Sequence, residues 1–392
     1  MDYDLLIVGG GLAGNCLALA LKNSGLKIAI VEAQPRDVLY AAALGDRALA
    51  LAAGTVDALK TLNLWQGIEH AATPIEQIHI SDKGHFGKTR LSAQKENVAA
   101  LGYVITARNL ETHIADQVFA TENVTLYCPA RVMGLIADEN AAFVSLKYND
   151  ESLNLTAKLV VGADGGQSSV RQLLNIQQHI SDYEQTALIT NITATRAHKN
   201  TAYERFTNSG PLALLPMGTH NFAVVWTRTT EEADALMLGS EADFIEQLQQ
   251  CFGWRLGELR LNAPRRAFPL SLIRAEAMIS ERAVIIGNAA HQLHPVAGQG
   301  FNLGLRDVTV LAEMLRQQNE IGDIGATGFL KRYAQMRQVD QSRTINFTDT
   351  VVRLFSNEWL ALAAVRNVGL VLLDVLPFAK TVLARHAMGY QR

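Results

Sequence analysis

Residues 4–33 read DLLIVGGGLAGNCLALALKNSGLKIAIVEA, and this stretch decides the fold. Two short apolar runs, LLIV and IAIV, are typical of strands buried in a parallel sheet. Between them, apolar residues recur at helical spacing from Leu12 to Leu21. The order strand, glycine turn, helix, strand is a βαβ unit, so we expect an α/β domain built on a parallel sheet.

The turn of this unit carries a glycine pattern suited to a dinucleotide. Gly9, Gly11 and Gly14 form G-x-G-x-x-G. The first glycine allows the tight turn, the second lets a pyrophosphate approach the backbone, and the third packs the helix on the strand. Glu32 ends the second strand, where its carboxylate can accept hydrogen bonds from both ribose hydroxyls of an adenosine and disfavours a 2′-phosphate. The unit therefore predicts a Rossmann-like domain that binds FAD or NAD rather than NADP.

Two later segments bear on the choice between FAD and NAD. KLVVGADGGQSSVR at 158–171 runs from a strand into a glycine-rich turn. GNAAHQLHPVAGQGFNLGLRD at 287–307 follows an apolar strand and leads into a helical pattern, and Pro295, Gly298 and Gly300 mark a loop between them. Backbone N–H groups at such a helix N-terminus stabilise negative charge that lies against them.

The composition narrows the class of protein. The chain has 392 residues, enough for two domains, and its 35 Lys and Arg against 38 Asp and Glu give a formal net charge of -3. This balance favours small-molecule partners and gives no reason to expect nucleic acid. Cys16, Cys128 and Cys251 form no CxxC pair, so we expect them to be small core residues in a reduced, cytoplasmic protein.

The two ends of the chain bear on its location. The chain opens on a strand and a glycine turn without a basic secretory segment. The longest apolar stretch, 359–379, is interrupted by two charges and a proline, so it does not predict a spanning helix. Residues 351–392 carry five Arg or Lys against two Asp or Glu, a net charge of +3. This tail could lie on the inner membrane as a peripheral contact or pack on the body as a helix pair.

The dispersed blocks resemble one family of enzymes. GxGxxG, then GADG with a following Arg, then G-[DN]-AAH-x-x-x-P-x-x-G-Q-G-x-N-x-G-x-x-D are similar to the blocks of the FAD-dependent aromatic hydroxylases, the para-hydroxybenzoate hydroxylase-like group. The resemblance spans nearly the whole chain, and the third block is highly specific. Within the group, GDRALAL at 45–51, ERFTNSGPLALLPM at 204–217 and FGWRLG at 252–257 are most similar to the branch that makes ubiquinone.

The resemblance implies that FAD is tightly bound and that particular residues hold it. The pyrophosphate would lie on the glycines of the first turn, and the adenosine ribose on Glu32. Arg47 and Arg108 would approach the flavin or its phosphates, and Asp164 would lie between the cofactor and the surface that binds nicotinamide. The residues implied in the third block are Asn288, Gly298, Gln299, Gly300 and Asn302.

Asn288 is a departure from the family pattern, which usually has Asp at this position. The family carboxylate takes a hydroxyl of the ribityl or pyrophosphate region. Asn retains an acceptor oxygen and adds donor N–H groups, so the contact can survive with one negative charge fewer.

The resemblance also implies a reaction in two halves, in which NAD(P)H reduces the flavin and O₂ then supplies an oxygen atom to an electron-rich aromatic ring. The protein must stabilise negative charge on the reduced flavin and exclude water. Gly298–Gly300 suit the first task, and His294 and Pro295 are expected to line the reactive face. No acid or base stands out. A single G-x-G-x-x-G indicates that NAD(P)H docks transiently on the surface.

A metal site is not expected, although His291 and His294 have a spacing that metal ligands can adopt. Proline follows the second histidine immediately, and no third ligand is near in sequence. The segment is already explained as a flavin loop.

The β-rich character of 181–270 predicts a second domain. Runs such as TALITNITA and FAVVWTR replace the βαβ rhythm and indicate a mixed sheet. We expect a substrate domain of 75–98 and 181–270, with the apolar 210–216 over the flavin. It would be inserted into an FAD-binding domain of 1–74, 99–180 and 271–345 and followed by a helical C-terminal segment, 346–392.

The favoured function is hydroxylation of a polyprenylated methoxyphenol, converting 2-polyprenyl-6-methoxyphenol to 2-polyprenyl-6-methoxy-1,4-benzoquinol on the way to ubiquinone. One alternative is hydroxylation at another ring position. Another is a small aromatic acid, whose carboxylate would need a cation such as Arg205, Arg265 or Arg266. A flavin reductase of prenyl double bonds, and a non-catalytic scaffold in a complex of ubiquinone-biosynthesis proteins, are further alternatives.

Overall fold

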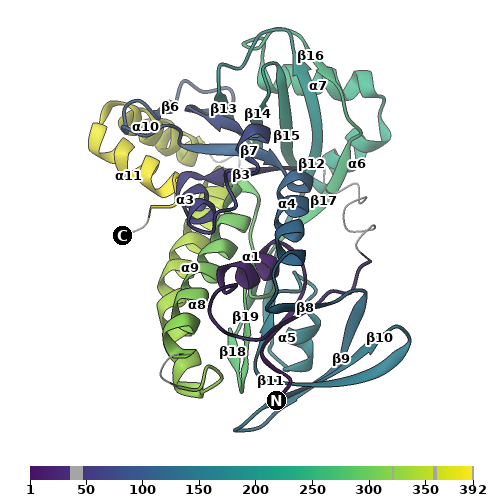
Figure 1. The fold of residues 1–392 in the computed structure, drawn as a ribbon. Helices are drawn as coiled ribbons and strands as arrows, with labels where there is room; N and C mark the ends of the chain where they lie inside the picture. The colour runs from purple at the N-terminus through teal and green to yellow at the C-terminus, as the bar shows by residue number, and fades with distance from the viewer. Residues whose placement is uncertain (36–46, 320–321, 356–359, 391–392) are drawn as a thin grey trace.

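The computed structural model describes residues 1–35, 47–319, 322–355 and 360–390. Two large sheets lie at opposite ends of the molecule, and long helices run alongside the first of them (Figure 1). The predicted α/β fold, with a parallel sheet, an added mixed sheet and a helical C-terminal region, is confirmed.

The first sheet is built on the βαβ unit. Its parallel strands are, in order across the sheet, β19 (Ala283–Ile285), β11 (Glu151–Gly162), β1 (Tyr3–Val8), β2 (Ile28–Val31) and β8 (Val124–Tyr127). Three strands are added in antiparallel orientation. β18 (Ile279–Ser280) pairs with β19, β10 (Ala142–Tyr148) pairs with β11, and β9 (Ala130–Ala137) pairs with β10.

Side chains of β1 show why this sheet is buried on both faces. Successive residues of a strand point to opposite faces. Leu5 and Ile7 therefore enter one core cluster, and Leu6 and Val8 enter the other. The first cluster is completed by helices α1 (Leu12–Ala20), α3 (Ala53–Thr61), α4 (Ala107–Phe119), α8 (Gln299–Asn319) and α9 (Thr327–Phe355).

The cysteines follow the prediction in part. Cys16 and Cys251 are buried, the first in α1 and the second at the C-terminal end of α7 (Glu241–Phe252). Cys128 is a correction, because it is partly exposed just after the edge strand β8 rather than in the core.

The second sheet is mixed and mostly antiparallel. Its strands are, in order, β20 (His291–Gln292), β17 (Arg266–Ala275), β12 (Gln178–Ala194), β15 (Asn221–Thr229), β14 (Gly210–Met217), β13 (Thr201–Thr207), β5 (Gln77–Asp82) and β6 (Lys88–Ser92), and β16 (Leu259–Leu261) pairs with β12. One face packs on α6 (Thr230–Leu238) and α7 in a cluster that contains Trp226 and Phe244. The other face is turned toward a cavity.

A small third sheet links the two large ones. It consists of β3 (Ala48–Ala52), β7 (Gly102–Thr106) and β4 (Thr73–Ile75). Ala48 and Val104 of this sheet share an apolar cluster with Ala202 and Leu215 of the second sheet. The small sheet and the second sheet therefore share an apolar contact, and β3 takes part in it.

The C-terminal helices α10 (Leu360–Val375) and α11 (Pro377–Ala387) pack on the body. Asn367 accepts a hydrogen bond from the backbone N–H of Gly87 at 2.7 Å, and the hydroxyl of Thr89 donates to the carbonyl of Leu370 at 2.7 Å. Helix α9 is continuous from Thr327 to Phe355. The limit predicted at 345 falls within this helix, and the predicted domain division stays a prediction.

A buried charge network joins the parallel sheet to α8 and α9. The Asp307 carboxylate accepts hydrogen bonds from the backbone N–H of Gly287 at 3.1 Å and from Arg337 Nε at 2.7 Å, and it lies 2.7 Å from His291 Nε2. Gln341 donates to the same carboxylate at 2.9 Å. Burial opposes ionisation, but these partners outweigh it and hold the pKa of Asp307 well below its usual range.

Replacing Asp307 by Asn should destabilise the fold strongly. The substitution leaves Arg337 buried with only part of its compensating charge, a change that typically costs about 3–5 kcal/mol. Chemical denaturation near neutral pH would measure the loss. Asp150→Asn is the matched control, because the Lys147–Asp150 pair is exposed and its loss should leave the unfolding free energy unchanged. Equal effects of the two substitutions would contradict the importance of the buried network.

Candidate active site

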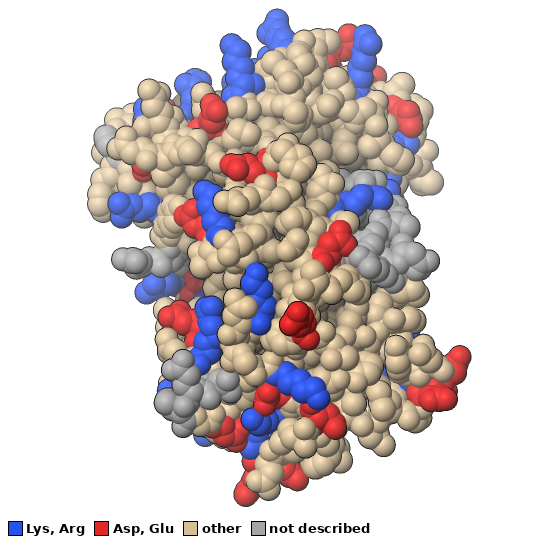
Figure 2. Space-filling model, viewed as in Figure 1, with Lys and Arg blue, Asp and Glu red and all other residues tan. Residues whose placement is uncertain are grey.

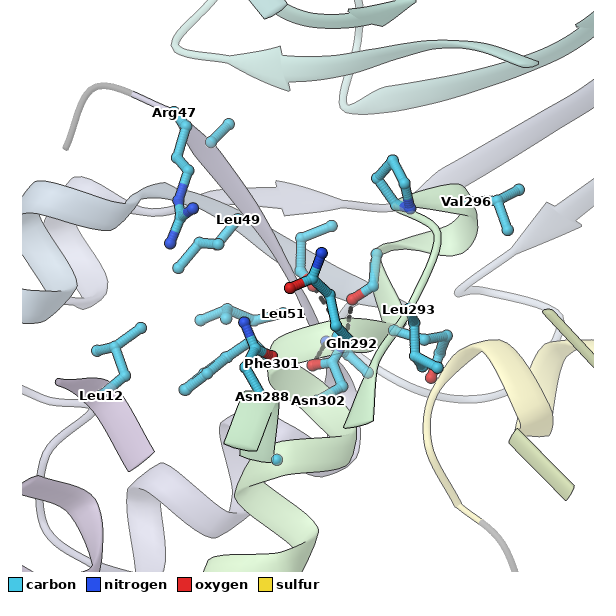
Figure 3. Close-up of a pocket in the computed structure, with 18 of the residues that line it drawn as sticks. Leu12, Arg47, Leu49, Leu51, Asn288, Gln292, Leu293, Val296, Phe301 and Asn302 are labelled. Atoms are coloured by element: carbon cyan, nitrogen blue, oxygen red, sulfur yellow. Dashed lines mark hydrogen bonds between the residues drawn. The ribbon is translucent and has the colours of Figure 1, made fainter. Parts of the chain in front are cut away.

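One long cavity runs between the two large sheets. Its volume is about 990 Å³, at the upper end of the range for small-molecule sites. It extends from the glycine turn before α1, past β3 and the 287–302 segment, to the inner faces of α9, α10 and α11. Figure 3 shows its middle, with Arg47 and Leu49 on one side and Leu293 and Val296 on the other. Both domains therefore contribute to one site.

The glycine turn leaves backbone exposed to this cavity. Gly9 has φ +107°, and an added Cβ would lie 2.5 Å from the carbonyl oxygen of Ala163. At Gly11, the N-cap of α1, an added Cβ would meet no protein atom within 4 Å. Gly9 and Gly11 line the cavity, so the helix N-terminus is open to an anionic group there.

Gly14 serves the contact between helix and strand. An added Cβ there would clash with the carbonyl oxygen of Gly9 and approach Ile7 of β1. Gly14 is not among the described residues that line the cavity. This matches the packing role that its position in the motif predicts, rather than a direct contact with a cofactor.

Glu32 lies directly after β2 with both carboxylate oxygens on backbone donors. Oε2 accepts from the N–H of Gly10 at 2.7 Å, and Oε1 accepts from the N–H of Gln34 at 2.7 Å. These bonds fix the side chain at the edge of the cavity, which it lines. Each ionised oxygen can accept a further hydrogen bond, so the carboxylate remains suited to ribose hydroxyls.

The two predicted arginines occupy different positions. Arg47 lines the cavity just before β3, and Glu111 of α4 is the carboxylate near it. Burial raises the pKa of Glu111, and the positive charge of Arg47 acts in the opposite direction. Arg108 lies in the first turn of α4 and is not among the described residues that line the cavity. Its contact with FAD stays a prediction.

Asp164 lines the cavity, but its carboxylate is engaged with the next helix, α5 (Ser169–Leu173). The hydroxyls of Ser168 and Ser169 donate to it at 2.5 and 2.8 Å, and the N–H of Val170 donates at 3.1 Å. The side chain therefore shapes the turn at the cavity wall. Its proposed place beside a nicotinamide remains a prediction.

The 287–302 segment forms a wall of the cavity next to β3. Asn288 is exposed within the cavity, and no hydrogen bond to its amide occurs in the described part of the chain. Helix α8 begins at Gln299, and Gly298, Gln299 and Gly300 line the cavity. Gly298 has φ +61°, which brings its backbone against Ala50 of β3. The predicted helix N-terminus therefore faces the site.

Asn302 clamps this segment to β3. Its oxygen accepts from the N–H of Ala52 at 3.0 Å and from the hydroxyl of Thr55 at 2.6 Å. Its NH₂ group donates to the carbonyls of Ala50 at 3.1 Å and Gly298 at 2.7 Å (Figure 3). The buried amide thus makes all four of the hydrogen bonds it can form and positions the loop, and its predicted contact with FAD stays a prediction.

Pro295 lines the cavity, but its neighbour His294 does not. The His294 ring is 1% exposed, packs edge-on against Tyr183 at 5.3 Å, and accepts from the N–H of Val296 through Nδ1 at 3.1 Å. Burial lowers its pKa to about 4. Pro295 therefore faces the cavity, as do Leu293 and Val296 of the same loop, and the reactive-face role predicted for His294 gains no support.

Two ionisable residues of this region were not singled out from the sequence. Asp307 ends the third block, and its pairing with Arg337 depends on a residue 30 positions away. Glu204 of β13 also lines the cavity, among apolar side chains. It occurs in a β-rich run, and the alternation of a strand does not by itself say which face is toward a ligand.

Comparisons with known proteins agree with this geometry. A family model described as an FAD binding domain matches residues 2–348. Ubiquinone hydroxylase UbiL of Rhodospirillum rubrum is 35% identical over 392 residues, covering 98% of this chain and 89% of that one. The 3-demethoxyubiquinol 3-hydroxylase of Escherichia coli is 28% identical and covers 98% of both chains. The p-nitrophenol 4-monooxygenase PnpA of Pseudomonas putida shares the fold, with a TM-score of 0.79, 18% identity and coverage of 100% and 99%.

The fold and the site define a flavin-dependent oxidoreductase. The chain belongs to the FAD-binding domain family, and it is an FAD-dependent aromatic-ring monooxygenase, as predicted. NAD(P)H is the co-substrate of this class. The residues present fit FAD, since open backbone at Gly11, the fixed Glu32 carboxylate and the unpartnered Asn288 amide face one cavity.

Gly11→Ala should weaken FAD binding without affecting the fold. The added methyl group meets no protein atom within 4 Å and would occupy the place where the pyrophosphate approaches the helix. Loss of one charge-assisted hydrogen bond, about 1.5–3 kcal/mol, would weaken binding roughly tenfold or more. Flavin absorbance per protein and a thermal melt would measure both effects. Gly328→Ala in α9, also free of clashes, is the control. Undiminished FAD affinity in Gly11→Ala would contradict the assignment.

Proposed function

We propose that the protein hydroxylates the aromatic ring of a polyprenylated methoxyphenol in ubiquinone biosynthesis. The observation that carries the proposal is the apolar far half of the cavity, which continues from the substrate sheet to the C-terminal helices. Relatives named ubiquinone hydroxylases and a 3-demethoxyubiquinol 3-hydroxylase support the pathway. The ring position, that of 2-polyprenyl-6-methoxyphenol, follows from the sequence resemblance alone.

The far half of the cavity suits an isoprenoid chain. Its walls are apolar side chains of the second sheet and of α9, α10 and α11. They include Phe206, Phe347, Phe355, Leu370, Leu373 and Leu383. Burial of apolar chain is favourable at about 25 cal/mol per Å². A prenyl group would gain binding energy along this half, and a small polar substrate would leave most of it unused.

The same walls argue against a small aromatic acid. Of the described residues that line the cavity, the only Lys or Arg side chains are Arg47 and Arg131. Arg131 follows Ala130, whose N–H donates to the backbone carbonyl of Glu32, so it lies in the cofactor half. Arg265 instead donates to the carbonyl of Leu236 at the end of α6. Arg205 and Arg266 are not among the lining residues. Among the described residues, a substrate carboxylate would therefore meet no Lys or Arg side chain in the far half.

The chain's own part in the reaction is binding, orientation and exclusion of water. Bound FAD would supply the redox chemistry, passing electrons from NAD(P)H to O₂ and an oxygen atom to the ring. The backbone N–H groups at Gly298–Gly300 would stabilise negative charge lying against the start of α8. The apolar walls exclude water from the reacting ring. Pro295 and Val296 would set how closely the ring approaches.

Oxygen labelling tests the proposed function. Purified protein with FAD and NADPH should convert 2-methoxy-6-geranylphenol to the corresponding hydroquinone and incorporate one atom from ¹⁸O₂ for each NADPH oxidised. Mass spectrometry measures the label, and NMR the ring position. NADPH oxidation without incorporation into this phenol would contradict the proposal. Efficient hydroxylation of 4-hydroxybenzoate instead would favour the small-acid alternative.

We also propose that the turn between α10 and α11 touches the membrane. Among the described residues, no helix is long and apolar enough to cross a bilayer. The exposed apolar side chains of this turn are Leu372, Val375, Leu376, Phe378 and Val382, each at least 49% exposed. Leu373 and Leu383, their neighbours in sequence, line the cavity. The turn would thus connect the bilayer with the cavity for a lipid-soluble substrate.

Charge on the tail contributes less to this contact than the sequence predicts. Arg366 is 3% exposed and lies against Asp82, with Nε 3.6 Å from Oδ2, and Lys380 pairs with Asp374 at 2.8 Å. Neither is directed to lipid. Both signs of charge are interspersed over the face in Figure 2, so that face offers no single-sign surface. Apolar contact at the turn therefore has the larger part.

Phe378→Ser should weaken binding to phospholipid vesicles. Insertion of a Phe side chain contributes about 1.5–3 kcal/mol, so partitioning should fall roughly tenfold or more. Co-sedimentation with phosphatidylcholine vesicles, with and without phosphatidylglycerol, would measure it. Leu238→Ser, at an exposed apolar residue at the end of α6, is the control. Unchanged vesicle binding by Phe378→Ser would contradict the contact and leave the turn available to a protein of the same pathway.

A further inference from the structure

Glu204 is an ionisable side chain in an otherwise apolar row of the cavity wall. The strand registers place Ile80, Glu204, Ala213, Val225 and Ile189 side by side across β5, β13, β14, β15 and β12. All five line the cavity. The other four are aliphatic, so the fold does not require an ionisable residue at this position. An apolar residue would pack as well or better.

The Glu204 carboxylate has no protein partner that explains it. Oε1 is buried without a hydrogen bond, and no ion pair to the side chain occurs among the described residues. Burial alone raises the pKa of Glu204 to about 7. The ionisable groups on neighbouring elements are Asp82, which lies two residues beyond the Ile80 partner of Glu204 on β5 and is paired with Arg366, and His386 of α11, which lines the cavity. None of them contributes to the raised pKa.

The neighbours of Glu204 on its own strand place it near the reactive loop. Phe206, two residues on, shares an apolar cluster with Val296 and stacks on Phe355 at 3.9 Å. Ala202, two residues back, shares a cluster with Ala48 of β3. Residues two apart on a strand are roughly 7 Å apart. On its strand, Glu204 therefore lies between the part of the substrate sheet that contacts β3 and the part that contacts the loop of Pro295 and Val296.

We propose that the Glu204 carboxylate accepts the proton of the substrate's phenolic hydroxyl and acts as the general base of ring hydroxylation. The proposal rests on the proposed function, because it names the group that recognises the phenol. A buried, unpartnered acceptor calls for a donor, and a phenol whose ring packs on apolar side chains supplies one. A base that titrates near neutrality is suited to this task.

The proton and electron balance of the step is simple. The phenolic O–H bond breaks and its proton forms an O–H bond to Glu204, while the electron pair left on oxygen raises the electron density of the ring. A ring carbon ortho or para to that oxygen then bonds the oxygen atom derived from O₂, and it loses its own proton when aromaticity returns. NAD(P)H supplies the two electrons that reduce the second oxygen atom to water. Glu204 returns the first proton to the product or to solvent.

Glu204→Gln is the decisive variant, because it retains shape and removes basicity. In the FAD-loaded wild type, 2-methoxy-6-geranylphenol should bind more tightly than its O-methyl ether, and hydroxylation should rise with pH through about 7. In Glu204→Gln this preference for the free phenol should weaken and the pH step should disappear, and hydroxylation should fall roughly 100-fold or more. Glu204→Asp should recover part of both. Exposed Glu258→Gln is the control and should match the wild type.

A stability measurement checks the variant without any substrate. A carboxyl whose folded pKa is raised stabilises the fold at low pH, and this contribution is lost as pH rises from 4.5 toward the folded value of about 7. Glu204→Gln should therefore melt at a higher temperature than the wild type above neutral pH, with the difference shrinking in acid. Full flavin content in the variant would show that the fold and the cofactor site are intact.

The outcomes separate this inference from the proposed function. A wild-type preference for the free phenol and wild-type hydroxylation in Glu204→Gln would overturn the role of Glu204. A wild type that hydroxylates no phenol, yet prefers the free phenol in a way that depends on Glu204, would contradict the proposed function and support phenol recognition at this residue. A wild type with neither hydroxylation nor this preference would overturn both.

Discussion

The buried carboxylate of Asp307 is the interaction on which the site depends. It bonds the backbone of Gly287, where the parallel sheet ends and the cavity wall begins, and it bonds Arg337 of α9 from its own position in α8. An ionised group at such depth is stable only if its partners are complete. Gly287, α8 and α9 must therefore assemble together. This places the N-terminus of α8, and with it Gly298–Gly300, at a defined distance from the glycine turn of α1.

The two halves of the cavity are suited to binding their ligands by different interactions. The cofactor half presents backbone and polar side chains that are held in place by hydrogen bonds, as Glu32 is held by Gly10 and the Gly298 turn by Asn302. The substrate half presents one face of a sheet and three helices, nearly all apolar. Preorganised dipoles suit a cofactor whose charge changes, and an apolar wall suits a substrate bound by burial.

Glu204 is a candidate functional residue because its ionised carboxyl destabilises the fold at this position in the cavity wall. An unpartnered carboxyl in an apolar wall destabilises the fold when it ionises, and an aliphatic residue there would not. Perturbed ionisable groups in a cavity are candidates for function for this reason. The proximity of its strand to Val296 and Phe355 connects the substrate sheet with the reactive loop and with the C-terminal helices.

The sequence by itself determined the βαβ unit, the open glycines, Glu32 and the helix N-terminus at 298–300, because each is a local pattern of strand or helix period, turn chemistry and short spacing. Tertiary structure alone decided which side chains meet. Asn302 forms hydrogen bonds with Ala52 and Thr55, some 250 positions away. The His294 ring packs against Tyr183 instead of facing the cavity. Strand register places Glu204 in the cavity wall. Periodicity encodes that a residue has a face, but the face that meets a ligand is chosen by packing between distant segments.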